Sequence, residues 1–142
     1  MIIHQLSVFI ENKPGAMMEV LAVLKENQVN IRALSLADTA DFGILRMIVN
    51  EPEKIQSTLR DAGYAVKISK VLTLTLDDDP GSLHEKVLRL SEAGINIEYL
   101  YAFAGGGDSF ARVVLKVDNL ELASKIANGE QGDQEDNYSF YW

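Results

Sequence analysis

The feature that most constrains this chain is an internal repeat with a constant spacing. A Pro-Gly pair occurs twice, at Pro14-Gly15 and at Pro80-Gly81, 66 residues apart. The same spacing carries Val29-Asn30-Ile31 onto Ile95-Asn96-Ile97 and Arg46 onto Arg112. It also aligns apolar positions of matching character, Met17 with Leu83, Leu21 with Val87 and Leu24 with Leu90. Such self-similarity predicts two copies of one structural unit.

Each copy shows the pattern β-α-β-β-α-β. Apolar residues alternate in the segments 6–10 and 71–76, which predicts strands, and helical spacing follows each Pro-Gly pair. Later elements are expected at 30–36, 44–49, 52–62 and 64–68, and at 96–102, 112–117 and 120–127. This order is the ferredoxin-like arrangement. The predicted fold class is therefore α+β, with two tandem units, 1–69 and 70–142. Because no flexible linker separates the two units, we expect them to pack together as one pseudo-dimer.

The ends of the elements differ between the two copies. Gly94 is placed to end the second copy's first helix in a left-handed cap, whereas Gln28 holds that position in the first copy, so we expect that helix to end differently. The acidic segment 128–137 carries no strand signal. The aromatic segment 138–142 is expected either to form a displaced fourth strand or to dock on a partner chain.

Composition narrows the functional classes. The chain has 142 residues and no cysteine, which excludes disulfides, thiolate zinc sites and cysteine nucleophiles. A net charge of −8 without a basic patch argues against nucleic acids and anionic membranes as partners. The sequence shows neither a signal-peptide pattern nor an apolar run long enough to span a bilayer, so we expect a cytoplasmic protein.

The order of these motifs resembles the ACT domain. The resemblance rests on Asn12-Lys13-Pro14-Gly15 and Asp78-Asp79-Pro80-Gly81 after a strand and before a helix, followed by Val29-Asn30-Ile31 and Gly94-Ile95-Asn96-Ile97. It covers nearly all of the chain except the last fifteen residues and is similar to stand-alone tandem ACT proteins. It implies a regulatory module whose sheets join side by side and whose strand-to-helix turns bind an amino acid at the junction with another unit. Because no catalytic domain is attached, a regulated enzyme or regulator would act in trans.

The chemistry of the turns agrees with such a ligand. The start of a helix offers unpaired N–H groups and a positive dipole to a carboxylate, glycine leaves room for close approach, and proline fixes the turn. Lys13 adds positive charge to the first turn, whereas Asp77, Asp78 and Asp79 crowd the second, so we expect the first to bind a carboxylate better. The predicted ligand-binding residues are Asn12, Lys13, Pro14, Gly15, Ala16, Met17, Asn30, Ile31, Asp78, Asp79, Pro80, Gly81, Ser82, Leu83, Asn96 and Ile97.

Other candidate sites favour structural explanations. The three aspartates before Pro80 suit helix N-capping better than Mg²⁺ or Ca²⁺ binding, and Gly105-Gly106-Gly107 suits a hairpin loop better than a phosphate cradle. Arg46 and Arg112 suit surface solubility or an inter-subunit ion pair, with anion binding as the minor alternative. The histidines, His4 and His84, lack metal-site spacing, and no nucleophile motif surrounds a serine. We therefore predict no cofactor, no metal and no enzymatic activity.

Strand alternation also predicts an uncovered apolar sheet face. This face comprises Phe9, Ile44, Ile48, Val71 and Val114, and such a surface would be sticky if exposed. We therefore expect a homodimer. The functional hypothesis is a sensor of a free amino acid. The alternative is a ligand-free protein–protein interaction module that uses the sheet and the aromatic tail.

Overall fold

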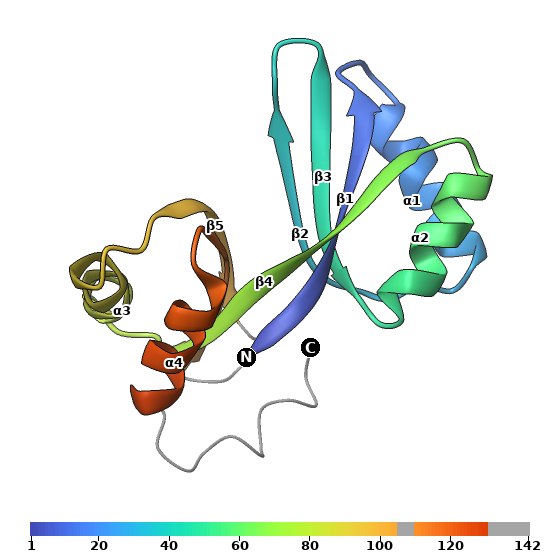
Figure 1. Ribbon diagram of the computed structural model, residues 1–142. Helices are drawn as coiled ribbons and strands as arrows, with labels where there is room; N and C mark the ends of the chain where they lie inside the picture. Colours follow the sequence, from blue (N-terminus) through green and yellow to red (C-terminus); the bar gives the residue numbers. More distant parts are fainter. Residues whose placement is uncertain (105–109, 131–142) are drawn as a thin grey trace. The chain divides into compact units, whose positions relative to one another are not determined.

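The computed structural model describes residues 1–104 and 110–130 and shows an α+β protein with strands and helices in the expected order (Figure 1). The first half holds β1 (Ile2–Glu11), α1 (Ala16–Glu26), β2 (Ile31–Asp38), β3 (Phe42–Val49) and α2 (Pro52–Asp61). The second half holds β4 (Ala65–Asp77), α3 (Ser82–Glu92), β5 (Ile97–Ala104), β6 (Phe110–Val117) and α4 (Leu120–Glu130). The predicted fourth strand of the first copy and first strand of the second are one continuous strand, β4.

The chain divides into two compact units. The first unit is His4–Ser69, and the second joins Met1–Ile3 to the described residues from Lys70 onward. Both β1 and β4 therefore contribute residues to each unit. The strands are hydrogen-bonded in the order β2-β3-β1-β4-β6-β5. Pairing is antiparallel between β1 and β3, β2 and β3, β4 and β6, and β5 and β6.

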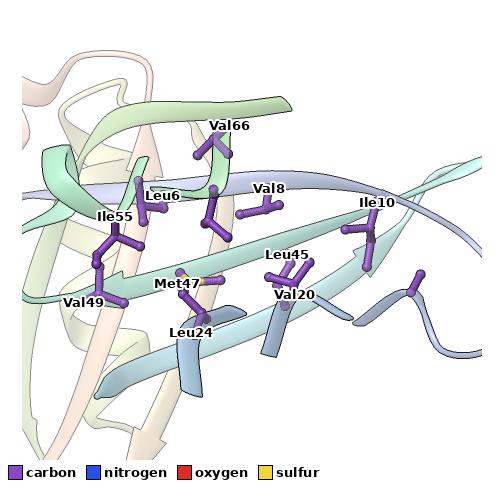
Figure 2. Packing of buried hydrophobic residues seen from close by; sticks show 12 residues of the cluster. Leu6, Val8, Ile10, Val20, Leu24, Leu45, Met47, Val49, Ile55 and Val66 are labelled. Carbon is purple, nitrogen blue, oxygen red and sulfur yellow. The ribbon is translucent and has the colours of Figure 1, made fainter. Parts of the chain in front are cut away.

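Each unit has its own hydrophobic core between its sheet and its helices. In the first unit, alternate residues of β1 point toward α1 and α2 and are buried there with residues of β3 (Figure 2). Burial on one face follows from the period of two, since successive strand residues point to opposite faces. The buried cluster is Leu6, Val8, Ile10, Ala16, Val20, Leu24, Leu45, Met47, Val49, Ile55, Leu59 and Val66. The second unit repeats this with Leu72, Leu74, Leu76, Leu90, Ile95, Val113, Leu115, Val117, Ala123 and Ala127.

Helices α1 and α3 end in the same way, which corrects one expectation. In α3, Gly94 has φ 77°, its N–H bonds the Ser91 carbonyl at 2.9 Å, and the next N–H reaches back five residues to Leu90 at 3.0 Å. In α1, Gln28 takes φ 55° and makes the corresponding bonds, at 3.1 Å to Lys25 and at 2.9 Å from Val29 to Leu24. The prediction of a different end was wrong, because satisfying the last helical carbonyls outweighs the strain of a side chain in the left-handed region.

The first residues of the chain pair with a strand of the second unit. The Met1 N donates to the Thr73 carbonyl at 3.1 Å, and the Thr73 N–H donates to the Met1 carbonyl at 2.8 Å. The Thr73 hydroxyl adds a third bond to the same carbonyl at 3.1 Å. A reciprocal pair of this kind is antiparallel, so Met1–Ile3 occupy the edge that a fourth strand of a ferredoxin-like unit would take. The aromatic segment 138–142, predicted either for that role or for docking, lies outside the described residues.

The sheet face opposite the helices is less exposed than expected. Ile48, Val71 and Val114 are buried within the single chain, whereas Phe9 remains 41% exposed and Ile44 is half-buried. The expectation that this whole face stays wet without another subunit was therefore wrong. The homodimer stays a prediction, and Phe9 and Ile44 are the part of this face that a second subunit could cover.

Candidate functional site: two strand-to-helix turns

The first candidate site is the turn between β1 and α1. The Lys13 N–H donates to the Glu11 carbonyl at 3.0 Å, and the Ala16 N–H donates to the Lys13 carbonyl at 3.3 Å, which closes a tight turn around Pro14. Gly15 takes φ 87° as the residue that caps the helix start. Asn12 to Gly15 are exposed, Ala16 is buried, and Met17 is half-buried. An added Cβ at Gly15 would meet nothing within 4 Å, so backbone conformation and not space requires glycine here.

The second turn, between β4 and α3, has the same backbone. The Ser82 N–H donates to the Asp79 carbonyl at 3.2 Å, and the Glu85 N–H donates to the Gly81 carbonyl at 3.1 Å. Gly81 takes φ 91° and also has open space where a Cβ would lie. Asp78 to Gly81 and Leu83 are exposed, and Ser82 is half-buried. The structure thus brings together the predicted residues of each turn.

Neither helix start is capped by a side chain. Gly15 and Gly81 hold the N-cap positions of α1 and α3, and no side-chain hydrogen bond caps either helix. The prediction that the aspartates before Pro80 serve as N-caps was therefore wrong. By contrast, the start of α4 is capped by Asn119, whose Oδ1 accepts the Leu122 N–H at 3.2 Å. The first amides, of Ala16 and Ser82, donate to turn carbonyls, and the amides that follow them keep their donor capacity, as expected where no side chain caps the helix.

The electrostatics of the two turns differ. Lys13 Nζ lies 3.1 Å from Glu11 Oε2, and the hydrogen bond and charge of Glu11 raise the pKa of Lys13, which keeps it protonated. The charges of the Glu11 and Lys13 side chains therefore sum to zero. The second turn carries Asp77, Asp78 and Asp79, all exposed. An anion meets less repulsion at the first turn, although Lys13 is already engaged.

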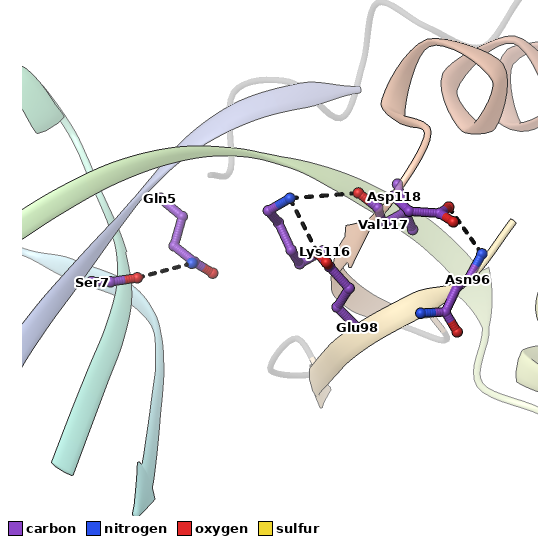
Figure 3. Close-up of polar contacts among 7 residues, drawn as sticks. All are labelled: Gln5, Ser7, Asn96, Glu98, Lys116, Val117 and Asp118. Atoms are coloured by element: carbon purple, nitrogen blue, oxygen red, sulfur yellow. Dashed lines mark hydrogen bonds and ion pairs between the residues drawn. The ribbon is translucent and has the colours of Figure 1, made fainter. Parts of the chain in front are cut away.

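Not all predicted residues lie near their own turn. Ile31 pairs with Val49 at one end of β3, whereas Glu11, which leads into the turn, pairs with Phe42 at the other end. Asn30 and Ile31 are therefore separated from the turn of their own unit by the length of β2. Asn96 and Ile97 hold the same position in the second unit, where the Asn96 N–H donates to Asp118 Oδ1 at 3.0 Å (Figure 3).

Sequence reasoning missed the β2–β3 loop, which lies against the first turn. The Asn12 N–H donates to the Asp41 carbonyl at 3.3 Å. Thr39 fixes this loop, because its N–H and hydroxyl both donate to the Phe42 carbonyl, at 2.7 and 3.2 Å. The predicted ferredoxin-like order of elements could have revealed this, because it places the β2–β3 loop and the first turn at the same end of the sheet. The exposed carboxylate of Asp41 therefore belongs to this corner of the first unit.

The two arginines matched by the repeat are not equivalent. The connection between β5 and β6 is two residues longer than that between β2 and β3, so the third strands are offset by 68 residues. Arg46 pairs with Ser7 and corresponds to Val114, which pairs with Thr73. Arg112 is only 5% exposed, so a role in surface solubility is wrong for it. Gly105-Gly106-Gly107 lies outside the described residues.

The remaining polar contacts are structural. Lys116 Nζ pairs with Glu98 at 3.2 Å, and the Gln5 side-chain amide approaches the Ser7 hydroxyl at 3.4 Å (Figure 3). His4 pairs with Glu53 at 3.2 Å on the surface. Among residues 1–104 and 110–130, no group of three or more His, Cys, Asp or Glu residues could hold a metal ion. None of the helices in these ranges has the length and apolar character needed to cross a membrane.

Two ferredoxin-like units, each with an uncapped glycine turn before its first helix, define a tandem regulatory fold of the ACT type. A family model described as "ACT domain pair" matches residues 1–133, and the chain belongs to this family. ACT domains are regulatory modules.

Solved structures agree with this assignment. Protein BT0572 from Bacteroides thetaiotaomicron is 38% identical, with a TM-score of 0.86, over 92% of this chain and 90% of that one. The ligand-free regulatory subunit of aspartate kinase from Thermus thermophilus has a TM-score of 0.63 at 13% identity, over 87% of this chain and 89% of that one. The corresponding subunit from Thermus flavus has a TM-score of 0.64 at 12% identity, over 89% and 91%. These two subunits share the fold. A comparison with curated proteins finds no match.

Proposed function

We propose that this protein is a sensor that binds a free amino acid at the turn before α1 and passes an allosteric signal to a partner protein in trans. The observation that carries the proposal is the glycine N-cap of α1, which has no side-chain cap and is exposed. Membership of the ACT domain pair family supports a regulatory role. The aspartate kinase regulatory subunits of the same fold support action on a separate chain.

The two charged groups of an amino acid find complementary groups at the first turn. The carboxylate accepts N–H groups from the start of α1, where the helix dipole is positive. The ammonium needs oxygen acceptors, which the side chains of Asn12 and Asp41 offer at the same corner. We assign the second turn to weaker binding, because Asp78 and Asp79 repel a carboxylate there. Asn30, Ile31, Asn96 and Ile97 enter the proposal only as residues that a neighbouring unit would present.

A ligand-free interaction module is the second candidate. The observation that favours it is a pair of exposed leucines, Leu34 and Leu36, on β2, where β2 has no second neighbouring strand among the described residues. Such a surface suits a protein partner whether or not an amino acid binds. The two candidates differ in one measurable property, which is stabilisation by a free amino acid.

A thermal-shift screen against the twenty amino acids separates the two candidates. Ligand at about 100 times its dissociation constant adds about 2.7 kcal/mol to the free energy of unfolding. The matched control is the carboxamide of any active amino acid, which keeps the ammonium and side chain but loses the carboxylate and should give no shift. Gly15→Val should abolish the shift and Gly81→Val should leave most of it. The opposite pattern would assign the site to the second turn, and no shift with any amino acid would favour the interaction module.

A further inference from the structure

The methionines of this chain gather at the turn before α1. Two of the four, Met17 and Met18, are the second and third residues of that helix. Met18 is 67% exposed and Met1 is 40% exposed, whereas Met17 is half-buried and Met47 is fully buried. A thioether is oxidised to a sulfoxide by peroxides that can reach it. Met18 is therefore the methionine that an oxidant in solution meets first.

Met18 stands where a side chain can reach the start of its own helix. Gly15 is the N-cap, so Met18 holds the third helical position. Side chains on a helix point back toward its N-terminus, and a glutamine at the third position bonds the backbone N–H at the N-cap. The sulfur of methionine lies where the amide carbon of glutamine lies, so a sulfoxide oxygen takes the place of the amide oxygen. The reduced thioether is only a weak acceptor.

The backbone N–H groups within reach of such an oxygen are not engaged. The N–H groups of Ala16 and Glu19 each donate to a carbonyl of the turn. Those of Gly15, Met17 and Met18 have no hydrogen bond to any residue that the structure describes. The space beside Gly15 is open, because a Cβ added there would meet nothing within 4 Å. A new acceptor on Met18 would therefore find both donors and room.

The turn before α3 lacks this chemistry. Leu83 and His84 hold the second and third positions of α3, behind the glycine N-cap Gly81. The sequence contains no methionine after Met47. The two turns share a backbone, so oxidation of a thioether distinguishes the first from the second. This property belongs to the residues of the first turn and does not follow from the fold.

We propose that Met18 is a redox modification site, at which hydrogen peroxide forms a sulfoxide whose oxygen accepts the free N–H groups at the start of α1 and blocks the carboxylate site there. The sulfur gives a lone pair to one peroxide oxygen, the O–O bond breaks, and the second oxygen leaves as water with both protons. The sulfur is oxidised and the peroxide is reduced. Methionine sulfoxide reductases restore the thioether, so the block is reversible. The inference rests on the proposed function for what is blocked, and the modification and its hydrogen bond are independent of it.

Mass spectrometry and amide spectra of the full chain test the modification itself. At a limiting dose of hydrogen peroxide, fragment masses should show oxygen added to Met18 before Met1, with Met47 left reduced. The backbone amide resonance of Gly15 should move on oxidation and return after treatment with a sulfoxide reductase. Met18→Leu keeps the other methionines, and the Gly15 resonance of this variant should not respond to the same dose.

Titration with the most active amino acid of the thermal screen tests the block. Oxidation should weaken its binding about fivefold, because a side-chain acceptor at a helix start competes for the same N–H groups. Met18→Gln carries such an acceptor permanently and should show the weaker binding without peroxide, whereas binding by Met18→Leu should not respond to peroxide.

Three results would overturn the proposal: oxidation of Met1 ahead of Met18, a Gly15 resonance that does not move, or equal binding by Met18→Gln and Met18→Leu. A screen in which no amino acid binds would overturn the proposed function instead. The Gly15 resonance would then still decide whether the sulfoxide bonds the start of α1.

Discussion

The turns before α1 and α3 share one backbone and differ in chemistry. Gly15 and Gly81 take φ 87° and 91°, and the two hydrogen bonds that open each helix, from Ala16 and Glu19 and from Ser82 and Glu85, match within 0.1 Å. The side chains beside them differ, with Lys13 paired to Glu11 in one turn and Asp79 in a run of aspartates in the other. Proline and glycine set the backbone, and the neighbouring charged residues set which ligand it attracts. Duplication thus kept the geometry and let the electrostatics diverge.

The largest expected effect tests whether the two backbones are equally strained. Gly15→Ala and Gly81→Ala should each lower the free energy of unfolding by about 1–2 kcal/mol, because alanine disfavours the left-handed region although its Cβ meets no neighbour. Chemical denaturation of both variants measures this. Gly43→Ala is a useful contrast, because there the added Cβ would lie 3.1 Å from Ile10 Cγ1. Unequal losses at Gly15 and Gly81 would break the structural equivalence of the turns.

Exchanging the charges of the turns sharpens the difference in chemistry. Lys13→Asp reverses an exposed charge and should weaken binding of an amino acid found by the thermal screen by about 1 kcal/mol, because solvent and salt screen charges at this surface. Asp79→Lys should strengthen binding at the second turn by a similar amount. Calorimetric titration at low and high salt checks both changes, because screening should reduce them. Insensitivity to salt and to both substitutions would show that charge does not distinguish the turns.

The second unit differs from the first in that the start of the chain, at Met1, pairs with Thr73 of its strand β4. Thr73→Val removes the hydroxyl bond to the Met1 carbonyl and should cost about 1 kcal/mol. Hydrogen exchange should show faster opening at Ile2 and Ile3 and in the second unit. Thr75→Val, on the same face of β4, is the matched control and should leave Ile2 and Ile3 protected. Equal effects of the two substitutions would argue against a special role for Thr73.

The ends of α1 and α3 offer a smaller test of the same comparison. Gln28→Gly should stabilise the protein by about 0.5–1 kcal/mol, since glycine relieves strain at φ 55° but loses more entropy on folding. Gly94→Gln should destabilise it by a similar amount. Thermal unfolding of the single variants and of the double exchange measures both. If the double variant differed clearly in stability from the parent chain, the ends of α1 and α3 would differ in more than the residue at this position.

The smallest effect concerns pH. Burial raises the pKa of Tyr64, which packs against the first core. Because the folded pKa lies above the unfolded one, the stability from this residue is full below about pH 10 and falls as the pH rises through the folded value. Tyr64→Phe removes the phenol, so its stability should decline less steeply above pH 10 than that of the parent chain. Parallel slopes of the two proteins in that range would contradict the assignment.

Much of the fold followed from local patterns. A strand was predicted from the alternation of Leu72, Leu74 and Leu76, and a helix from the spacing of Val20 and Leu24. Both predictions succeed because the period of the apolar residues reflects which side of an element faces the core. The residues of both turns were found from Pro-Gly alone. Asn30 and Asn96 were assigned to the same sites although the strand register separates them from their turns. Asp41 was missed because its closeness to Asn12 depends on a hairpin that returns to the turn.

The sequence by itself determined the duplicated ferredoxin-like order, the ACT-type turns and the difference in charge between them. These are properties of neighbouring residues, whose conformational preferences and charges act locally. Only the tertiary structure decided that Met1–Ile3 pair with β4 beside Thr73, that Arg46 corresponds to Val114, and that Val71 and Val114 are buried. Each of these depends on strands far apart in the chain, and their pairing is set by the competition of whole surfaces for burial and hydrogen bonds.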